Sequence, residues 1–335
     1  MRKRSYLTLI IGAILLIAGI VYSIITYNTS YMESRNLADT VSGLTQEIKE
    51  VEAGSLTGDL DALNAQLLDV KDQKLAAEKP YAYGLTIVFF SILLTLRGLY
   101  NAIHGKKEAS KANITRLAQA GLMTALCYIG FTFLKIDIPV GPEKTAFHFG
   151  NVFCVLAALL LGGYWGGLSG AIGMTLADLT TSYVTSAPKT FLLKLCIGLI
   201  VGFVAHVIFK ISRDHHSKKY LTATTIISCC GGMVFNIVAD PIVGYFYKMY
   251  LLGIPQDLAS ALAKMSALTT SVNAVLAVVL ASLIYLALRP ALKKSGLFVA
   301  LSPEKASKAE KNASTLSVDT DTNVSDEDAD VSDKV

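Results

Sequence analysis

The most restrictive feature of this sequence is a series of eight apolar segments, most of them about 20 residues long, which is the length that crosses the hydrocarbon core of a bilayer as a helix. The segments are residues 5–27, 81–103, 117–134, 148–163, 166–184, 189–210, 222–246 and 262–288. A helix satisfies its backbone hydrogen bonds internally, as lipid requires. The sequence therefore predicts an all-α membrane protein.

Charge is distributed unevenly along the chain and indicates how the segments are oriented. Only 17% of residues are charged, against about 25% in ordinary soluble domains. Short basic clusters follow the second, sixth and eighth apolar segments, and basic loops stay on the cytoplasmic side of a membrane. We therefore expect a multi-pass protein of the cell membrane with both termini cytoplasmic. Nucleic-acid binding is disfavoured, because the basic residues do not gather on one face.

The polar segments divide the chain into regions. Residues 1–105 are expected to form two transmembrane helices joined by an extracellular coiled hairpin, residues 28–79, which carries ten acidic and five basic residues. Apolar residues at spacings of four and three predict its first arm; they are Leu37, Val41, Leu44, Ile48 and Val51. A basic cytoplasmic linker, residues 106–116, leads to a six-helix membrane domain, residues 117–290. Residues 300–335 are expected to be a disordered acidic cytoplasmic tail.

Ionisable and amide side chains inside the apolar segments are costly, and so they are candidates for a binding site. Asp178, Lys189, Lys194 and Asp240 fall in the middle or outer half of their segments, together with the amides of Asn236 and Asn273. We expect them to line a pocket open to the outside. The alternative is an Asp178–Lys194 ion pair that only stabilises packing.

Two further candidates follow the outer loop at residues 135–147, which contains two prolines and a glycine and is suited to cover a pocket. His148 and Asn151 lie at the mouth of the next segment. A lone histidine in such a place is more often a satisfied interfacial residue than a ligand contact.

Several other kinds of site are disfavoured by the sequence. The five cysteines lie in apolar segments without metal-ligand spacing, so neither a disulfide scaffold nor a metal site is expected. Glycines four residues apart indicate close helix contact rather than a phosphate loop; they are Gly163 with Gly167, Gly166 with Gly170, and Gly198 with Gly202. Without a nucleotide motif or a catalytic arrangement, we expect no enzyme activity and no cofactor.

Residues 112–290 resemble the substrate-binding S component of energy-coupling factor (ECF) vitamin transporters, in particular the riboflavin-transporter-like branch. Residues 146–203 carry the clearest motifs in order. These are His148, Gly150 and Asn151; Leu161, Gly162 and Gly166; Ala177 to Leu179; and Ala187 to Phe191 followed by Lys194. Asn273 resembles an asparagine of the last helix of the family.

The resemblance implies a six-helix bundle that captures a small water-soluble vitamin or precursor from outside and delivers it by toppling in the membrane. Its partners would be a coupling membrane subunit and two ATP-binding subunits, so the chain would have no ATPase site of its own. Riboflavin is the substrate after which this branch of the family is named, and the sequence does not identify the vitamin bound by this chain. The family's coupling face falls here on Ala118, Gly121 and Ala125. The extra N-terminal region and the tail depart from the family, and we expect the hairpin to be an accessory that contacts a surface protein or the cell wall.

Three other functions fit the sequence less well. A stand-alone secondary transporter would need internal repeats and coupling carboxylates, of which only Asp178 and Asp240 are available. A membrane anchor acting through its hairpin would not need polar residues inside the membrane helices. An intramembrane enzyme lacks a convincing nucleophile or metal cluster.

Overall fold

The computed structural model describes residues 2–104, 114–213, 216–298 and 301. Most of the expected basic linker at 106–116, and all of the expected tail at 300–335 except Leu301, lie outside these residues. The helices begin and end as follows: α1 Arg2–Thr26, the π-helical turn η1 Tyr27–Tyr31, α2 Met32–Glu52, α3 Leu60–His104, α4 Ile114–Thr132, α5 Gly150–Leu161, α6 Gly163–Thr180, the 3₁₀ turn η2 Val184–Ser186, α7 Ala187–Gly202, the π-helical turns η3 Phe203–Ile208 and η4 Tyr247–Leu251, α8 Lys218–Phe246, and α9 Gln256–Lys294.

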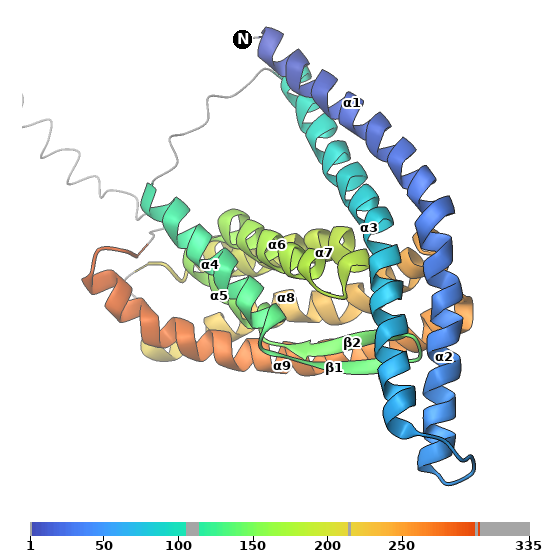
Figure 1. Cartoon of the computed structure of the whole chain (residues 1–335). Coiled ribbons are helices and arrows are strands. Elements are labelled where there is room, and N and C mark those ends of the chain that lie inside the picture. Colours follow the sequence, from blue (N-terminus) through green and yellow to red (C-terminus); the bar gives the residue numbers. More distant parts are fainter. Residues whose placement is uncertain (1, 105–113, 214–215, 299–300, 302–335) are drawn as a thin grey trace, which may run out of the picture.

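The first three helices form two long antiparallel arms, one made of α1 and α2 and the other of α3, which we call the long helix pair (Figure 1). Helices α1 and α2 follow each other through η1 without a break and run beside α3, so each expected transmembrane helix continues into an arm of the hairpin. Val41, Leu44 and Ile48 of α2 are buried, as their spacing predicts. The chain reverses after α2 at Gly54, which has a positive φ of 72°.

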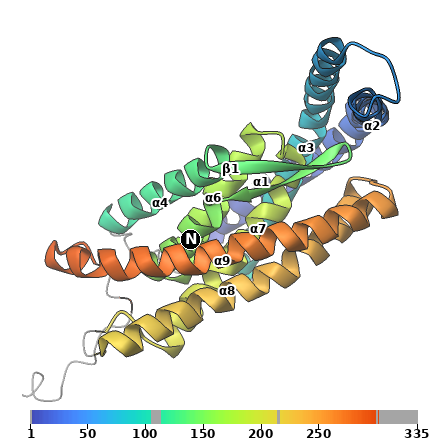
Figure 2. The same ribbon diagram turned by 90° about the horizontal axis from the view of Figure 1, so that it is seen from below.

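Helices α4 to α9 form the membrane bundle, with α5 inside it and α8 beside α9 (Figures 1 and 2). Eleven of the twelve residues of α5 are buried, which explains why that segment is apolar on all sides. Cys127, Cys154 and Cys229 belong to the same apolar core, so they pack as small apolar residues. An all-α membrane protein is therefore what the sequence folds into.

The expected glycine contacts between helices are present. A Cβ atom on Gly198 would collide with the backbone of Gly167, and one on Gly202 with the backbone of Gly163. These positions bring the backbones of α6 and α7 into direct contact, because no side chain separates them. Gly166 meets α5 in the same way, at Ala158.

The helices match the eight expected membrane segments only in part, because the segments in α4, α5 and α6 are not among the stretches long and apolar enough to cross a membrane. Five helical stretches in the described part of the chain are long and apolar enough to cross a membrane: 6–52, 60–103, 184–208, 218–251 and 256–294. Helix α5 has only 12 residues, about 18 Å at 1.5 Å per residue, where a 16-residue segment was expected. The chain turns back at Gly162, whose φ of 84° ends the helix.

The loop expected at residues 135–147 is a regular β-hairpin. Strand β1 (Lys135–Val140) pairs antiparallel with β2 (Glu143–His148), with Val140 opposite Glu143. Gly141, with a φ of 59°, takes the first position of the two-residue turn, where a type II′ turn requires a positive φ. The loop is thus a two-stranded β-hairpin, a small addition to an otherwise helical protein.

The long helix pair contacts the bundle. Tyr31 and Tyr81 of the pair form a small apolar cluster with Leu252 and Ile254 of the α8–α9 connection and Ala259 of α9. Figure 1 shows the pair crossing the bundle obliquely, with the β1–β2 hairpin pointing toward it. The helical hairpin is therefore held against the bundle at the α8–α9 connection.

Candidate functional site

A polar cavity of about 90 Å³ lies among the bundle helices, beneath β2. All eight side chains singled out from the sequence line it; they are His148, Asn151, Asp178, Lys189, Lys194, Asn236, Asp240 and Asn273. They come from β2, α5, α6, α7, α8 and α9, so the cavity is a shared product of the whole bundle. A cavity with converging polar groups is the usual form of a small-molecule site.

One wall of this cavity is the ion pair of Lys189 and Asp240, in which both carboxylate oxygens of Asp240 have a bonding partner. The Lys189 ammonium lies 2.9 Å from an Asp240 carboxylate oxygen. The second carboxylate oxygen accepts hydrogen bonds from the hydroxyls of Ser266 and Thr270 of α9. Lys189 and Asp240 therefore form a structural ion pair, and together with Ser266 and Thr270 they connect α7, α8 and α9.

The same cavity also has buried polar atoms without hydrogen-bond partners in the described part of the chain, besides Nδ1 of His148. They are the side-chain oxygens Oδ1 of Asn151, Oδ2 of Asp178 and Oδ1 of Asn236. Lys194 is 6% exposed, and no acidic group lies within 4.0 Å of its ammonium among the described residues. The Asp178–Lys194 ion pair considered from the sequence is therefore not formed. Unpaired buried groups are costly, so those that line this cavity make it the candidate site for a polar ligand.

His148 and Asn273 connect the cavity to the outer hairpin. The backbone N–H of His148 donates to Oδ1 of Asn273, 3.0 Å away, and Nδ2 of Asn273 donates to the carbonyl of Ala146 at 3.1 Å. Asn273 thus braces β2 against α9, which the sequence did not reveal. The His148 ring packs edge-on against Phe131, at 4.7 Å between ring centroids.

The β-hairpin also makes a charged contact at the outer rim. The Tyr183 hydroxyl donates to Asp137 at 2.9 Å, and the ammonium groups of Lys135 and Lys144 each lie 3.3 Å from the same carboxylate. Burial alone would raise the pKa of Asp137, but the Tyr183 hydrogen bond and the two lysines outweigh it and lower that pKa. Asp137 is therefore ionised and fastens the hairpin to the turn after α6.

Sequence reasoning missed several residues that line the cavity: Lys144, Tyr183, Thr190, Lys248, Ser266 and Thr270. A signal for two of them was present. Ser266, Thr270 and Asn273 are spaced by four and three in an apolar helix, and this spacing places them on one face. Tyr183 and Lys248 lie outside any such pattern.

The proposed partner face lies elsewhere, on the outward side of α4. Ala118, Gly121 and Ala125 are all exposed, and a Cβ on Gly121 would meet no atom within 4 Å. This face is separate from the polar cavity, whose α4 contribution is Phe131.

A helical membrane bundle enclosing a polar cavity defines a membrane protein that binds a small molecule. The chain belongs to the family of ECF-type riboflavin transporter S components, because the family model matches residues 111–290, more than half of the sequence. The matched region begins after the long helix pair and contains the bundle except for the last four residues of α9. Neither a curated protein nor a solved structure matches the chain.

Proposed function

We propose that this chain is the substrate-capture subunit of an ATP-driven ECF importer for a small, polar, water-soluble vitamin or precursor. The observation that carries this proposal is the group of unpartnered buried atoms on Asn151, Asp178 and Asn236 beside Lys194. A ligand with both a donor and an acceptor or anionic group would satisfy these groups at once. The chain would bind that ligand from outside, with both of its own termini in the cytoplasm.

The character of the cavity favours a polar substrate over a large planar one. Asp178, Lys194 and three asparagine amides line it, whereas Phe131 and Tyr183 are its aromatic members. Its volume of about 90 Å³ equals about three water molecules, against roughly 300–1,000 Å³ for sites that hold drug-sized ligands. A vitamin would therefore enter by displacing a wall of the cavity. The family name by itself does not make riboflavin the substrate.

Energy would come from partner chains. A coupling membrane subunit would dock on the α4 face at Ala118, Gly121 and Ala125, whose small side chains permit close helix approach. Two ATP-binding subunits would drive the cycle through that coupling subunit. The chain itself would act as a binding protein and not as an enzyme.

The test is a gentle purification of the full-length chain from its native membranes, followed by mass spectrometry of the proteins and small molecules that accompany it. We expect a coupling protein, two ATP-binding proteins and one polar small molecule. Asp178→Asn should lose the small molecule and keep the proteins. Gly121→Leu should do the opposite, because its side chain would project from the docking face.

Asp39→Asn is a matched control, since it removes one acidic charge at an exposed position of α2. It should keep both kinds of partner. Recovery of the well-folded parent chain without ATP-binding proteins and without a small molecule would overturn the proposal.

A further inference from the structure

The long helix pair is fastened to the outer end of the bundle by two tyrosines. The Tyr31 hydroxyl donates to the carbonyl of Leu252 at 2.9 Å, and the Tyr81 hydroxyl donates to the carbonyl of Leu251 at 2.8 Å. The two rings lie 4.6 Å apart between centroids. Tyr31 is the last residue of η1, between α1 and α2, and Tyr81 lies on α3. Both antiparallel arms are therefore hydrogen-bonded to the chain at the end of η4, which leads into α9.

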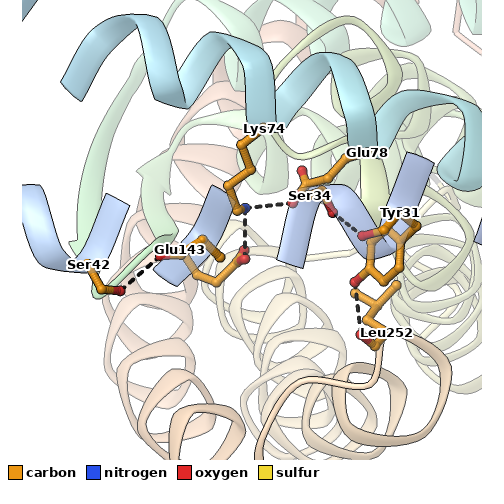
Figure 3. A network of polar contacts seen from close by, with 8 residues as sticks. Tyr31, Ser34, Ser42, Lys74, Glu78, Glu143 and Leu252 are labelled. Carbon is orange, nitrogen blue, oxygen red and sulfur yellow. Dashed lines mark hydrogen bonds and ion pairs between the residues drawn. The ribbon is translucent and has the colours of Figure 1, made fainter. Parts of the chain in front are cut away.

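Beyond this anchor, Lys74 of α3 reaches the β-hairpin. Its ammonium lies 2.6 Å from Glu78 on the same helix and 3.0 Å from Glu143 at the start of β2 (Figure 3). The Lys74 and Glu78 side chains are each 10% exposed, and Glu143 is 24% exposed. Glu143 directly follows the Gly141–Pro142 turn, so the Lys74–Glu143 ion pair contacts the hairpin next to its turn.

The same strand covers the substrate cavity. Lys144, Thr145, Ala146 and His148 of β2 line the cavity, whereas Glu143, at the start of the strand, is not part of that lining and contacts Lys74 of α3 instead. The hairpin thus has α3 on one side and the cavity on the other. Its position over the cavity depends on both.

A second, larger cavity lies between α3 and the hairpin. Its volume is about 610 Å³, and its walls include Lys71 and Lys79 of α3, Pro142 of the hairpin and Thr181 after α6. Lys144 lines both cavities, so a displacement of this part of β2 would connect them. The larger cavity has the volume of a small-molecule site, and the smaller one does not.

We propose that the α2–α3 helix pair is the outer wall of the substrate site, and that Lys74 is a positioning residue that holds the β1–β2 hairpin over the pocket through Glu143. This inference rests on the proposed function, because it concerns how a substrate reaches that pocket. The hairpin is the wall that moves, since a two-stranded hairpin has little stability of its own, whereas the helices are packed on several sides. The space between α3 and the hairpin is then the outer chamber through which the substrate passes.

Glu78 makes this contact reversible. When Glu143 moves away with the hairpin, the Lys74 ammonium keeps its partner at 2.6 Å and is never left as an unpaired buried charge. Glu143, the more exposed of the two acids, enters water on release. The Lys74–Glu143 contact therefore adds one charge-assisted hydrogen bond to the contacts of Asn273 and Tyr183 that also hold the hairpin, and its loss shifts the balance toward opening.

The test measures access to the pocket without any substrate. Thr270→Cys places a thiol in the pocket at a position that is 6% exposed. The rate at which a water-soluble, anionic methanethiosulfonate reagent modifies it is followed by mass spectrometry in the full-length protein, with the parent chain giving the background of the native cysteines. Adding Glu143→Gln should raise the rate about tenfold, as expected for the loss of one charge-assisted hydrogen bond.

Three further variants separate positioning from general damage. Lys74→Met should raise the rate as Glu143→Gln does, and the double variant should add nothing more, because both changes remove the same interaction. Lys74→Arg should keep the slow rate, since it retains the charge. Glu47→Gln, which removes an acidic charge at an exposed position of α2, should leave the rate unchanged.

Equal labelling rates in the Thr270→Cys chain with and without Glu143→Gln, and with and without Lys74→Met, would overturn the inference. An equal acceleration by Glu47→Gln would also overturn it, because the effect would then be one of net charge. The labelling assay needs neither a ligand nor partner subunits, so its failure is distinct from a failure to find a substrate or ATP-binding proteins.

Discussion

The Lys189 ammonium of α7 lies 2.9 Å from the Asp240 carboxylate of α8, whereas Lys194, five residues further along α7, has no acidic partner within 4.0 Å among the described residues. Two lysines of one helix thus enter the same cavity in different states. Lys189 is paired with an acidic group of the protein, and Lys194 is not, within the part of the chain that the structure describes. This difference separates a residue that ties the cavity walls together from one that the proposed function assigns to the ligand.

Replacing Asp240 should therefore destabilise the fold. Asp240→Asn leaves the Lys189 charge buried without its partner, and breaking a buried ion pair costs about 3–5 kcal/mol. We expect a clear fall in the thermal unfolding midpoint of the purified protein. The double variant Asp240→Asn with Lys189→Met should recover much of the loss, because no unpaired charge remains. An unchanged midpoint in the single variant would show that the pair is not stabilising.

The contact between α6 and α7 should tolerate no added methyl group. Gly198→Ala directs a Cβ into the backbone of Gly167, and overpacking of this kind costs about 1–3 kcal/mol. The expected result is a lower unfolding midpoint and less monodisperse protein in detergent. Gly121→Ala is the matched control, because its Cβ meets open space. Similar losses in both variants would mean that the close approach is not the cause.

Removal of the Asn273 side chain should loosen the hairpin over the cavity. Asn273→Ala deletes two hydrogen bonds to β2 and leaves the His148 N–H and the Ala146 carbonyl without those partners, at a cost of about 1–3 kcal/mol for each group left unsatisfied. Hydrogen exchange at the β1–β2 amides should become faster, while exchange in α6 and α7 stays as in the parent chain. Asn36→Ala, at an exposed position of α2, should change neither.

The outer rim should respond to acid through Asp137. Its pKa is lowered in the folded protein, so the contacts of its carboxylate stabilise the hairpin above the ordinary aspartate pKa of about 3.9 and are lost as the pH falls through the lowered value. Hydrogen exchange of β1, corrected for its intrinsic pH dependence, should show no change between pH 7 and 5. It should accelerate only below about pH 4. Asp137→Asn should show the faster exchange already at neutral pH.

Much of the bundle was predictable from local patterns. The apolar lengths indicated helices, the glycines four residues apart indicated where α6 meets α7, and the spacing of Val41, Leu44 and Ile48 indicated the buried face of α2. Each of these depends on the period of one helix and on which residues are small or apolar. The all-α class and the family resemblance needed nothing more.

The β-hairpin was less predictable. Ile136, Ile138 and Val140 alternate with polar residues and a proline, but the run is only six residues long, and the charged, proline and glycine residues in and around it favoured a loop. Its strands are held by partners distant in the sequence, such as Asn273 and Tyr183. Such contacts form only once α6 and α9 have been brought to the same end of the bundle.

The sequence by itself determined that this is a helical membrane protein, and it identified the eight polar side chains, because charge in an apolar segment is costly wherever the helix packs. Only the tertiary structure decided which of those side chains are paired with each other and which keep unpartnered polar atoms. Asp240 is bonded to Lys189 while Asp178 keeps an unpartnered oxygen, since ion pairing depends on a few ångströms between helices. The structure also decided that Lys74 meets Glu143, 69 residues away, and so made the N-terminal helix pair part of the site. No periodicity within one segment contains that information.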